Sequence, residues 1–580
     1  MQKKLAIISI LILTAGLAVI GFFIQKDRKE ISSDPYMAIS RDAAIIIETT
    51  EFQNLLNLIT SGKGLFGELS KVKEFITFRM KLDFLKEKLK QPGFKRILND
   101  NKSLIAFYPA HKERLSPLLS MTIPSGIRLR HLKGILNESG IWQISEKSSD
   151  RKKIALLPYS LNGSSDTLFL TVFQGLLLCS TSESVINRAI VQTESKDNVR
   201  SLTAFSRIFS ASGKNQDKLF IIFKNLETII NPVFGNNYKH LAGIIVMLAG
   251  SAGGDIYLSE NLLSLNGYTE FSSQDEYLYK YKSVAPGALE TFKILPSSTV
   301  LFETIIFSEK TKNIDGAGEY SESGRQFALD LYQYIVDGEV TKALLDIKDQ
   351  PVNENLLIIY ELKNRVQCEQ ILTSSLNSKS DILYFQPDDQ TRMPVYKTGK
   401  RELHSILVPG LAQGFEDLFY AFYENYMVTG NSYSTIARFL YDNLLRKTLV
   451  NDLSYREFEK TLPSRAGYYF YCVPGRIIDY LDGILSSEII NGFRSNRVSL
   501  DKIQALGYQF ASSNEMLYNS LSVSFKEDVR EESVAEWETL LDTVACIKPF
   551  FFTNYNTGAR EIFIQDMNNN AYLVNAAGRI

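Results

Sequence analysis

The residues from Leu176 to Ile190 read LLLCSTSESVINRAI, and those from Tyr426 to Leu440 read YMVTGNSYSTIARFL. Each stretch begins with an apolar run typical of a strand, continues through a Ser-rich turn and ends with apolar residues at helical spacing. Four positions of the first stretch recur 250 residues later, namely Ser182 as Ser432, Ser184 as Ser434, Ile186 as Ile436 and Arg188 as Arg438. A Ser at the start of a helix supplies an oxygen that caps its first N–H groups. The chain is therefore predicted to build one strand–turn–helix unit twice.

Five further pairs of segments repeat in the same order around this unit. They are Asp42–Glu48 with Ser297–Glu303, Asp166–Ser180 with Glu416–Gly430, Ser201–Phe209 with Asn451–Leu462, Asp217–Phe223 with Gly467–Val473, and Gly254–Phe271 with Gly507–Phe525. Several of them contain consecutive strands joined by polar turns, which favours antiparallel sheet. We therefore predict an α+β protein with two tandem similar modules, 40–285 and 286–530, that join near Pro286 and Gly287. Such a pair is expected to be pseudo-symmetric and to meet across a cleft or along a shared edge.

The N-terminus carries a second strong signal, because Leu5 to Ile24 contain no charged residue. At about 1.5 Å per residue, this run spans ~30 Å, the thickness of the hydrocarbon core of a bilayer. No small-x-small cleavage pattern follows it, so residues 1–24 predict an uncleaved transmembrane signal anchor, followed by a linker over 25–39. A single N-terminal anchor normally exports the chain behind it. We expect one span in the inner (cytoplasmic) membrane and a periplasmic bulk.

Composition is that of a globular protein with a large core: the 580 residues are 45% hydrophobic and 22% charged. The formal net charge is −1, so the excess of cationic side chains that nucleic-acid binding requires is missing. The four cysteines are Cys179, Cys368, Cys472 and Cys546, without C-x-x-C spacing. Because Cys179 and Cys472 lie in apolar, strand-like runs, buried free thiols are favoured over disulfides.

Glycine-rich and histidine motifs of known sites are missing from the sequence. Ser61–Gly64 lacks the frame of a phosphate-binding loop and is typical of a turn before a helix. The glycines of Ser251–Asp255 precede a strand, whereas those of a dinucleotide-binding loop open a helix. The four histidines, which are His111, His131, His240 and His404, are isolated and lack zinc-ligand spacing. We therefore predict no metal site and no bound cofactor.

Carboxylates and aromatic runs also lack the pattern of a catalytic site. Neighbouring pairs such as Asp388–Asp389 and Glu416–Asp417 are typical of solvated loop or helix-start charges. Asp566–Asn570 resembles a calcium loop only faintly, because the Gly at loop position 6 and the Glu at position 12 are missing. Tyr468–Tyr471 is more typical of a packed strand than of a platform for bases. No catalytic residue is predicted.

After Phe525 the pattern changes, and residues 531–580 are predicted to form a separate β segment. Glu561–Asp566 and Ala571–Ala576 read as the two strands of a hairpin around a turn of Met and three Asn residues. Short strands with Asn and Gly turns recur in the blades of β-propellers, but one hairpin cannot close a propeller. The segment is expected either to dock as an edge hairpin on the sheet of the second module or to be the start of a truncated propeller.

Several of these segments together resemble a known family. They are the anchor, the strand DAAIIIE at Asp42, the segment ILPSSTVLFE at Ile294, and the closing segments that begin with WETLLDT at Trp537 and end with NAAG at Asn575. The chain is similar to uncharacterised, membrane-anchored exported proteins of Bacteroides-type bacteria, which are classed as a domain of unknown function. The resemblance covers most of the chain and implies export and membrane anchoring. Family members continue into a propeller-like region, and the family supplies no catalytic residues.

Three hypotheses for function follow. The first is a non-enzymatic, membrane-anchored protein outside the cytoplasm that binds or scaffolds another protein of the cell envelope; the Phe and Tyr residues of the chain would supply its interfaces. The second is a protein that binds a lipid or another hydrophobic ligand in a cleft between the two modules. The third is an enzyme whose site is assembled from scattered carboxylates.

Overall fold

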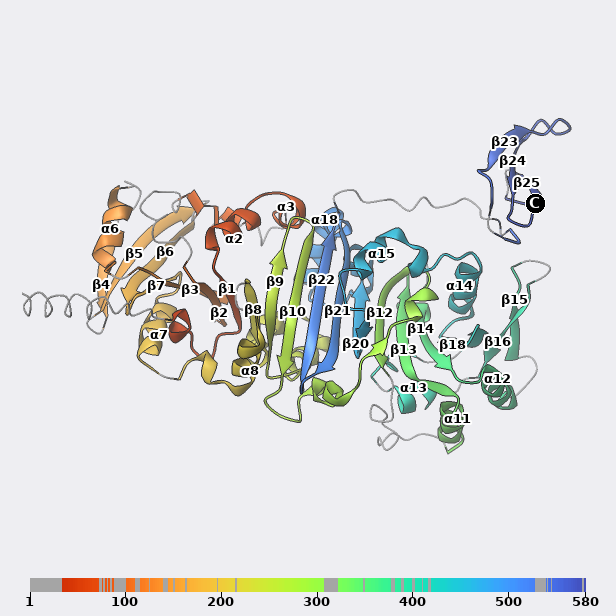
Figure 1. Ribbon diagram of the computed structural model, residues 1–580, viewed down its shortest axis with the longest axis horizontal. Coiled ribbons are helices and arrows are strands. Elements are labelled where there is room, and N and C mark those ends of the chain that lie inside the picture. The colour runs from red at the N-terminus through yellow and green to blue at the C-terminus, as the bar shows by residue number, and fades with distance from the viewer. Residues whose placement is uncertain are drawn as a thin grey trace, which may run out of the picture.

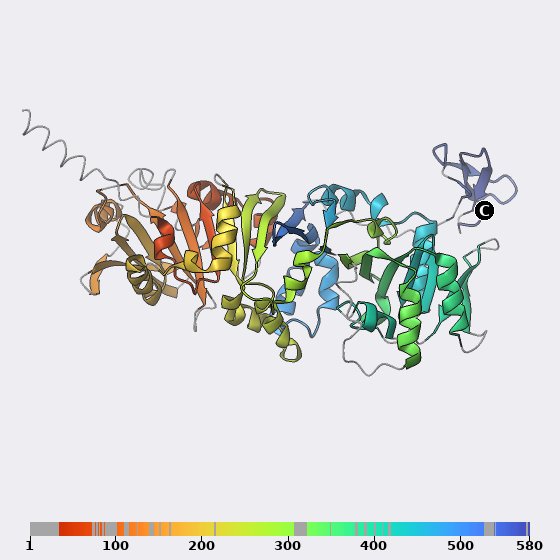
Figure 2. The same cartoon turned by 60° about the horizontal axis from the view of Figure 1, so that its bottom comes forward.

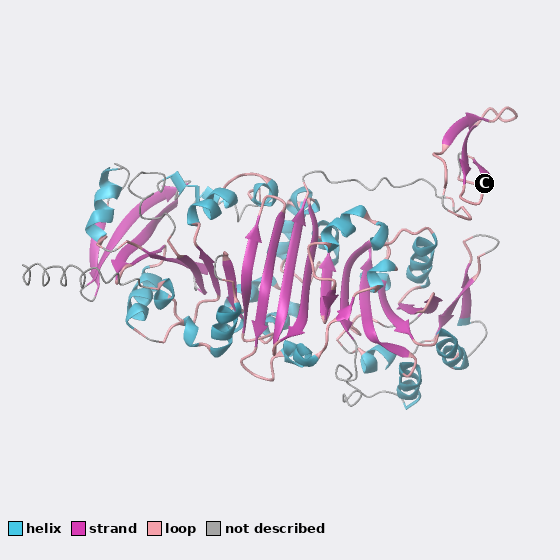
Figure 3. Cartoon of the chain, viewed as in Figure 1, coloured by secondary structure: helices cyan, strands magenta, loops and turns pink. Residues whose placement is uncertain are grey.

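The computed structural model is an α+β protein built around a large antiparallel sheet (Figures 1 and 3). The structure describes residues 34–580 apart from 72–75, 77–78, 81, 84–85, 88–100, 110–114, 125, 139–143, 150–151, 162–163, 196, 214–215, 307–321, 348–349, 377–380, 388–390, 399–401, 409, 416–418, 527–538, 540, 544 and 576–577. The predicted anchor therefore lies outside the described residues. No helix in the described part of the chain is long and apolar enough to cross a membrane.

Twenty of the described strands form one continuous sheet. The first half runs from its outer edge as β4 (Ser145–Ser149), β5 (Lys152–Leu161), β6 (Ser164–Phe173), β7 (Leu176–Ser180), β3 (Leu115–Thr122), β2 (Ser103–Pro109), β1 (Ile45–Thr49), β8 (Lys218–Ile222), β9 (Ser251–Leu258) and β10 (Leu262–Glu270). The second half continues as β22 (Met516–Phe525), β21 (Ile503–Ser513), β20 (Tyr468–Cys472), β12 (Thr299–Ile306), β13 (Ile335–Leu345), β14 (Leu356–Leu362), β18 (Tyr426–Gly430), β17 (Phe419–Tyr423), β16 (Met393–Lys397) and β15 (Ile382–Phe385). Every pairing is antiparallel, so the α+β class with antiparallel sheet is confirmed.

The same connections occur in both halves. β1 lies between β2 and β8, and β12 lies between β13 and β20. The predicted strand–turn–helix units are present, as β7 followed by α7 (Glu183–Glu194) and as β18 followed by α14 (Tyr433–Leu444). The segment that includes Asp166–Ser180 forms the β6–β7 hairpin, as the sequence predicts. Ser432 caps α14 by accepting a hydrogen bond from the Thr435 amide.

The two halves meet along one shared edge, where β10 pairs with β22. The pairing is antiparallel and runs from Leu262 opposite Ser524 to Thr269 opposite Leu517. A second contact between the halves lies outside the sheet, where the Gly235 amide bonds to the Ile484 carbonyl at 2.9 Å. Its reciprocal bond joins the Ser486 amide to the Val233 carbonyl at 2.8 Å. These two bonds form an isolated antiparallel β-bridge between Phe234 and Leu485.

Helices cover both faces of the sheet in each half (Figure 3). They include α2 (Phe52–Ile59), α6 (Leu129–Glu138), α7, α8 (Thr203–Ala211) and α10 (His240–Val246) in the first half, and α11 (Glu322–Tyr332), α12 (Arg365–Ser374), α13 (Glu402–Leu407), α14, α15 (Leu453–Glu459) and α17 (Ser487–Ser495) in the second. Neighbouring strand residues point to opposite faces. In β14, Ile359 accordingly packs in the core under α14 and α15, and Ile358 packs in the core under α11, α12 and α13. Each half therefore has two cores, one on each face.

A buried ion cluster also joins the halves beside the sheet. Glu68 of α3 (Gly64–Leu69) accepts hydrogen bonds from the Ser499 hydroxyl and the Lys502 ammonium, both at 2.8 Å. Ser499 lies in α18 (Arg497–Asp501), and Lys502 follows it. Burial opposes ionisation of Glu68, but the hydrogen bonds from Lys502, Lys71 and Ser499 outweigh it and lower the pKa of Glu68 to about 2. Glu68 therefore stays charged and holds α3 of the first half to α18 of the second.

The glycine-rich segments have structural roles. Gly64, the last residue of the predicted turn, is the first residue of α3 and has a φ of 53°. A Cβ on Gly64 would lie 2.1 Å from the Glu260 carbonyl oxygen. Gly254 lies within β9 opposite Gly267 of β10, so the glycines of Ser251–Asp255 form a strand and open no helix. A Cβ on Gly254 would lie 2.3 Å from the Gly267 Cα. Both glycines allow a close approach of two backbones.

The C-terminal segment forms a separate sheet of three described strands, which Figures 1 and 2 show apart from the main sheet. The predicted hairpin is present as β24 (Arg560–Gln565) and β25 (Ala571–Val574). The sheet has one strand more than the prediction, because β23 (Phe550–Thr553) also pairs with β24. A two-stranded hairpin is marginal in water, and a third strand stabilises it. Described pairings join none of the three strands to the main sheet, so the expected docking as an edge hairpin is not seen in the described residues.

Candidate functional site

The residues that repeat in the sequence serve the strand-to-helix turns. Ser182 is the N-cap residue of α7, but among the described contacts its hydroxyl accepts no hydrogen bond from the helix backbone. The Ser182 hydroxyl lies 2.9 Å from that of Ser184. Arg188 pairs with Asp42 of the loop before β1. In the second half, Arg438 Nε lies 2.8 Å from Asp442 Oδ2, one turn along the same helix. These side chains stabilise the two helices, and their contacts do not place a nucleophile beside a general base.

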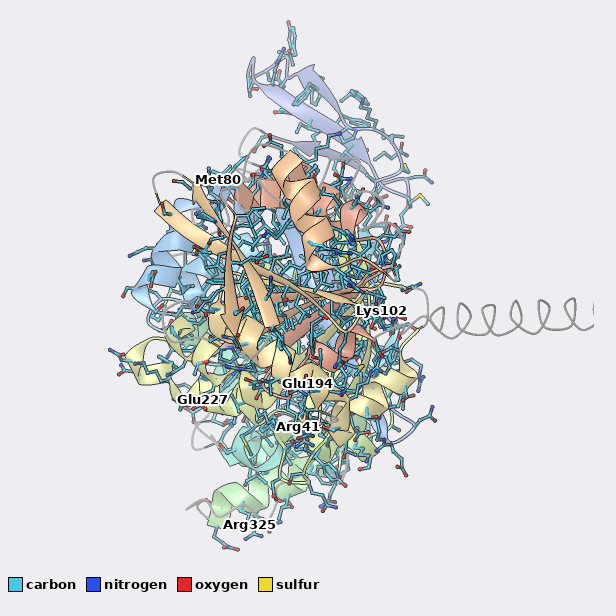
Figure 4. The ribbon with its side chains drawn as sticks, turned by 90° about the vertical axis from the view of Figure 1, so that its left-hand side faces the viewer. Arg41, Met80, Lys102, Glu194, Glu227 and Arg325 are labelled. Atoms are coloured by element: carbon cyan, nitrogen blue, oxygen red, sulfur yellow. The ribbon has the colours of Figure 1, made fainter. Side chains whose placement is uncertain are left out.

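A buried carboxylate near the centre of the first half is fully paired. Glu48 of β1 accepts a hydrogen bond from Tyr36 at 2.7 Å and from the Lys218 ammonium of β8 at 2.9 Å. Lys102, labelled in the end-on view of Figure 4, lies 3.1 Å from the same carboxylate. Burial favours the neutral acid, but the hydrogen bonds from Tyr36 and Lys218 and the nearby ammonium charges outweigh it, so the pKa of Glu48 falls. This cluster stabilises a charge inside the fold.

Glu303, which the sequence aligns with Glu48, has a different environment. It lies on β12 opposite Lys342 of β13, and no described cation reaches ion-pair distance of its carboxylate. Burial raises the pKa of Glu303, although a hydrogen bond from Tyr468 and the charge of Lys342 act in the opposite direction. Burial also lowers the pKa of Lys342, whose ammonium donates to the Gln413 carbonyl at 2.6 Å. Shifts of this kind occur in active sites and also in buried structural pairs.

His404, beside that pair, is a structural histidine of the core. Its Nδ1 lies 2.6 Å from the Tyr360 hydroxyl and its Nε2 lies 3.2 Å from the Thr429 hydroxyl. Burial, with a smaller contribution from the charge of Lys342, lowers the pKa of His404 to about 3. A neutral imidazole bonded on both nitrogens packs in the core and is not free to transfer protons to a substrate.

The other residues that the sequence singled out are placed as follows. Asp566 holds its own turn, accepting hydrogen bonds from the Asn568 and Asn570 amides at 2.9 and 2.8 Å and from the Tyr572 hydroxyl at 2.8 Å. Tyr468–Tyr471 forms most of the packed strand β20, as predicted. The carboxylate pairs at 388–389 and 416–417 and His111 lie outside the described residues. No group of metal-ligating side chains is found in the part of the chain that was searched, which is the described part.

The cysteines are free in the described structure, as predicted. Cys368 and Cys472 are buried and Cys179 is partly buried, and burial raises the pKa of each thiol to about 12. Cys546, near the C-terminal sheet, is instead exposed, contrary to the expectation of burial. It lies in the loop before β23, whereas Cys179, Cys368 and Cys472 lie in β7, α12 and β20.

The C-terminal sheet exposes large apolar side chains. Phe550, Phe563 and Leu573 lie directly opposite one another on its three strands, and the rings of Phe550 and Phe563 are 5.0 Å apart. Phe550 is 52% exposed and Leu573 is 48% exposed, while Phe551 on the other face is 71% exposed. We call these side chains, Phe550, Phe551 and Leu573, the aromatic edge. Exposed apolar side chains like these, with Phe550 and Leu573 on one face and Phe551 on the other, are typical of an interaction surface.

A hollow of about 410 Å³ lies at one end of the β10–β22 seam. Its lining comes from the 3₁₀ helix η6 (Tyr277–Ser283), which follows β10, and from Glu515 in the β21–β22 turn. Asn514 and Glu515 have φ values of 49° and 64°, as in the tight turns that favour hairpins. This site was not among the sites considered from the sequence. Its only sign in the sequence is the alternation of Tyr and Lys over 279–282, whose meaning depends on which carboxylates lie nearby.

Comparison with protein-family models, with curated proteins and with solved structures gives no match for this chain. The resemblance to exported, membrane-anchored proteins therefore stays a prediction.

Proposed function

We propose that the chain is a non-enzymatic protein, anchored in the inner membrane by Leu5–Ile24, that binds or scaffolds another protein of the cell envelope from the periplasmic side. The observation that carries this proposal is the aromatic edge of the C-terminal sheet. Aromatic residues are enriched in the centres of protein interfaces, where they bury a large apolar area.

The main sheet suits a scaffold because it forms one elongated body (Figures 1 and 2). We further propose that its halves are copies of one module. The matching strand connections and the two units β7–α7 and β18–α14 support this duplication. Hydrogen bonds across β10 and β22 tie the halves together, so the body is expected to move as a unit.

The partner at the aromatic edge is expected to be a protein and not a lipid. β23 pairs on one side with β24, and no other described strand pairs with it. Its other side can offer backbone N–H and C=O groups that only a hydrogen-bonding partner satisfies, because hydrocarbon cannot. A strand from a partner would add to the sheet and cover the neighbouring phenylalanines at the same time.

The direct test is a photo-cross-linking amino acid in place of Phe551, in the full chain and in intact cells. We expect it to capture one envelope protein, because the side chain is exposed beside the free edge of β23. The same amino acid in place of Tyr257, which is 59% exposed on β9 of the main sheet, is the matched control and is expected to capture none. The adduct is identified by mass spectrometry.

Two outcomes would overturn the proposal. Capture of the same proteins at both positions would mean random contact, and capture of lipid alone would favour the hydrophobic-ligand hypothesis. Phe551→Glu, which places a charge on the aromatic edge, is expected to reduce cross-linking from the neighbouring Phe550 position by about tenfold. The exposure of Phe551 makes this variant safe for folding, which circular dichroism would verify.

The periplasmic placement has its own test through Cys546, the exposed thiol. A membrane-impermeant maleimide added to spheroplasts is expected to label the chain, and Cys546→Ser is expected to abolish most of the label because the other described thiols are buried or partly buried. Labelling that requires lysis of the spheroplasts would place the bulk of the chain in the cytoplasm.

A further inference from the structure

The hollow at the end of the seam is built by the geometry of η6. A 3₁₀ helix has three residues per turn, so residues three apart share a side. Leu278 and Tyr281 form the buried side, and Tyr281 packs edge-on against Phe510 of β21 with their centroids 5.3 Å apart. The Ser512 hydroxyl also bonds to the Lys282 carbonyl. η6 is therefore fixed to the sheet, and Tyr279, Lys280, Lys282 and Ser283 line the hollow.

Two lysines of that surface lie against aromatic rings. The Lys280 ammonium lies 4.3 Å from the centroid of Tyr277 and 5.2 Å from that of Tyr281, and the Lys282 ammonium lies 5.4 Å from the centroid of Tyr279. Among the described residues, neither ammonium has a carboxylate at ion-pair distance. Loss of hydration lowers the pKa of Lys280, a cost that a bound anion would offset.

The carboxylate of Glu515, which lines the hollow, faces Arg207. Glu515 is 79% exposed, and its carboxylate lies 3.9 Å from Arg207, whose other nitrogen is 2.8 Å from Glu270. The Ser283 hydroxyl and the phenol of Tyr279 add neutral groups that can donate hydrogen bonds. The lining thus combines two cations, two hydroxyl donors, the ring of Tyr279 and one carboxylate that faces Arg207.

We propose that this hollow binds an organic anion, in which a phosphate or carboxylate group meets Lys280 and Lys282 and an adjoining ring or apolar part lies against Tyr279. A volume of about 410 Å³ holds a small molecule of this class. Ammonium groups bind phosphate as point charges, and tyrosine faces stack with flat rings. The anion could come from a lipid headgroup or from a free metabolite, since both present the same chemistry. This inference does not depend on the aromatic edge.

The test uses the full chain in detergent and phenyl phosphate as the probe, with binding measured by calorimetry. We expect saturable binding that is tighter than that of inorganic phosphate, because the ring adds a contact with tyrosine. The double variant Lys280→Glu and Lys282→Glu is expected to weaken binding by at least about tenfold, since it replaces attraction with repulsion. Glu515→Gln is expected to strengthen it by about twofold to threefold.

The matched control reverses two other exposed lysines, Lys224→Glu and Lys239→Glu, which change the net charge equally and lie outside the hollow. An equal loss of binding in this control would overturn the proposal, as would an absence of binding at millimolar phenyl phosphate. Circular dichroism of each variant separates loss of binding from loss of fold. A short-chain phosphatidic acid that binds more tightly than phenyl phosphate would identify a lipid headgroup as the source, and the reverse order a free anion.

Discussion

Replacing Lys218 with methionine is expected to lower the free energy of unfolding by about 3–5 kcal/mol, because it removes one partner of a buried ion pair and leaves the charge of Glu48 short of compensation. Both side chains are almost fully buried, and their charged atoms are 2.9 Å apart. Lys102 and Tyr36 would still contact Glu48 but cannot replace the second ammonium. Chemical denaturation followed by circular dichroism measures the change.

Lys147→Met is the matched control for this variant. Lys147 pairs with Glu183 at 2.6 Å, but the two side chains are 55% and 35% exposed. Surface ion pairs contribute about 0–1 kcal/mol, so this substitution is expected to have little effect. Equal losses in the two variants would mean that the buried pair contributes no more than a surface pair.

The same cluster predicts a dependence on pH. The pKa of Glu48 is lower in the folded chain than its ordinary value of 4.5. Its contribution to stability is therefore present above pH 4.5 and is lost as the pH falls through the folded value. In Lys218→Met, the free energy of unfolding is expected to fall less on acidification, because the pKa of Glu48 rises toward its ordinary value when Lys218 is removed.

Gly254→Ala is expected to lower the free energy of unfolding by about 3 kcal/mol, because overpacking against a fixed backbone cannot relax locally. The new Cβ would lie 2.2 Å from the Asn266 carbonyl oxygen and 2.3 Å from the Gly267 Cα, so β9 and β10 would have to separate. Because β10 also forms the seam with β22, that displacement would reach the contact between the halves.

The aligned position in the second half supplies the control. A Cβ at Gly507 would lie 2.7 Å from Leu462 Cδ1 and 2.8 Å from Phe458 Cζ, which are the ends of side chains. Side chains adjust more cheaply than paired strands, so Gly507→Ala is expected to cost about 1 kcal/mol. Thermal and chemical denaturation of both variants would test the order, and a larger loss at Gly507 would contradict it.

Local patterns allowed much of the fold to be predicted. The units β7–α7 and β18–α14, and the hairpins β6–β7 and β24–β25, depend on residues close in sequence, where periodicity and turn residues act directly. The pairing of β10 with β22 could not be predicted in this way, because it joins residues about 250 positions apart. The sequence of neither strand indicates which strand pairs with it. A cleft and a shared edge therefore both remained open as ways for the halves to meet.

The candidate sites were less predictable than the fold. Glu48 and Lys218 are 170 residues apart, and neither stands out among the many charged residues of the chain until β1 and β8 are placed side by side. The hollow depends on Lys280 and Lys282 having no carboxylate at ion-pair distance among the described residues, which a sequence does not reveal. β23 was missed because Phe550–Phe552 has no alternation of polar and apolar residues.

The seam between β10 and β22 also has a consequence for mass action. If each half were a separate chain, these two edges would find each other by diffusion, and the fraction joined would fall on dilution. Within one chain the partner edge is present at a fixed effective concentration that the connection through η6 sets. The seam is therefore expected to persist at the low copy numbers at which a two-chain version would dissociate.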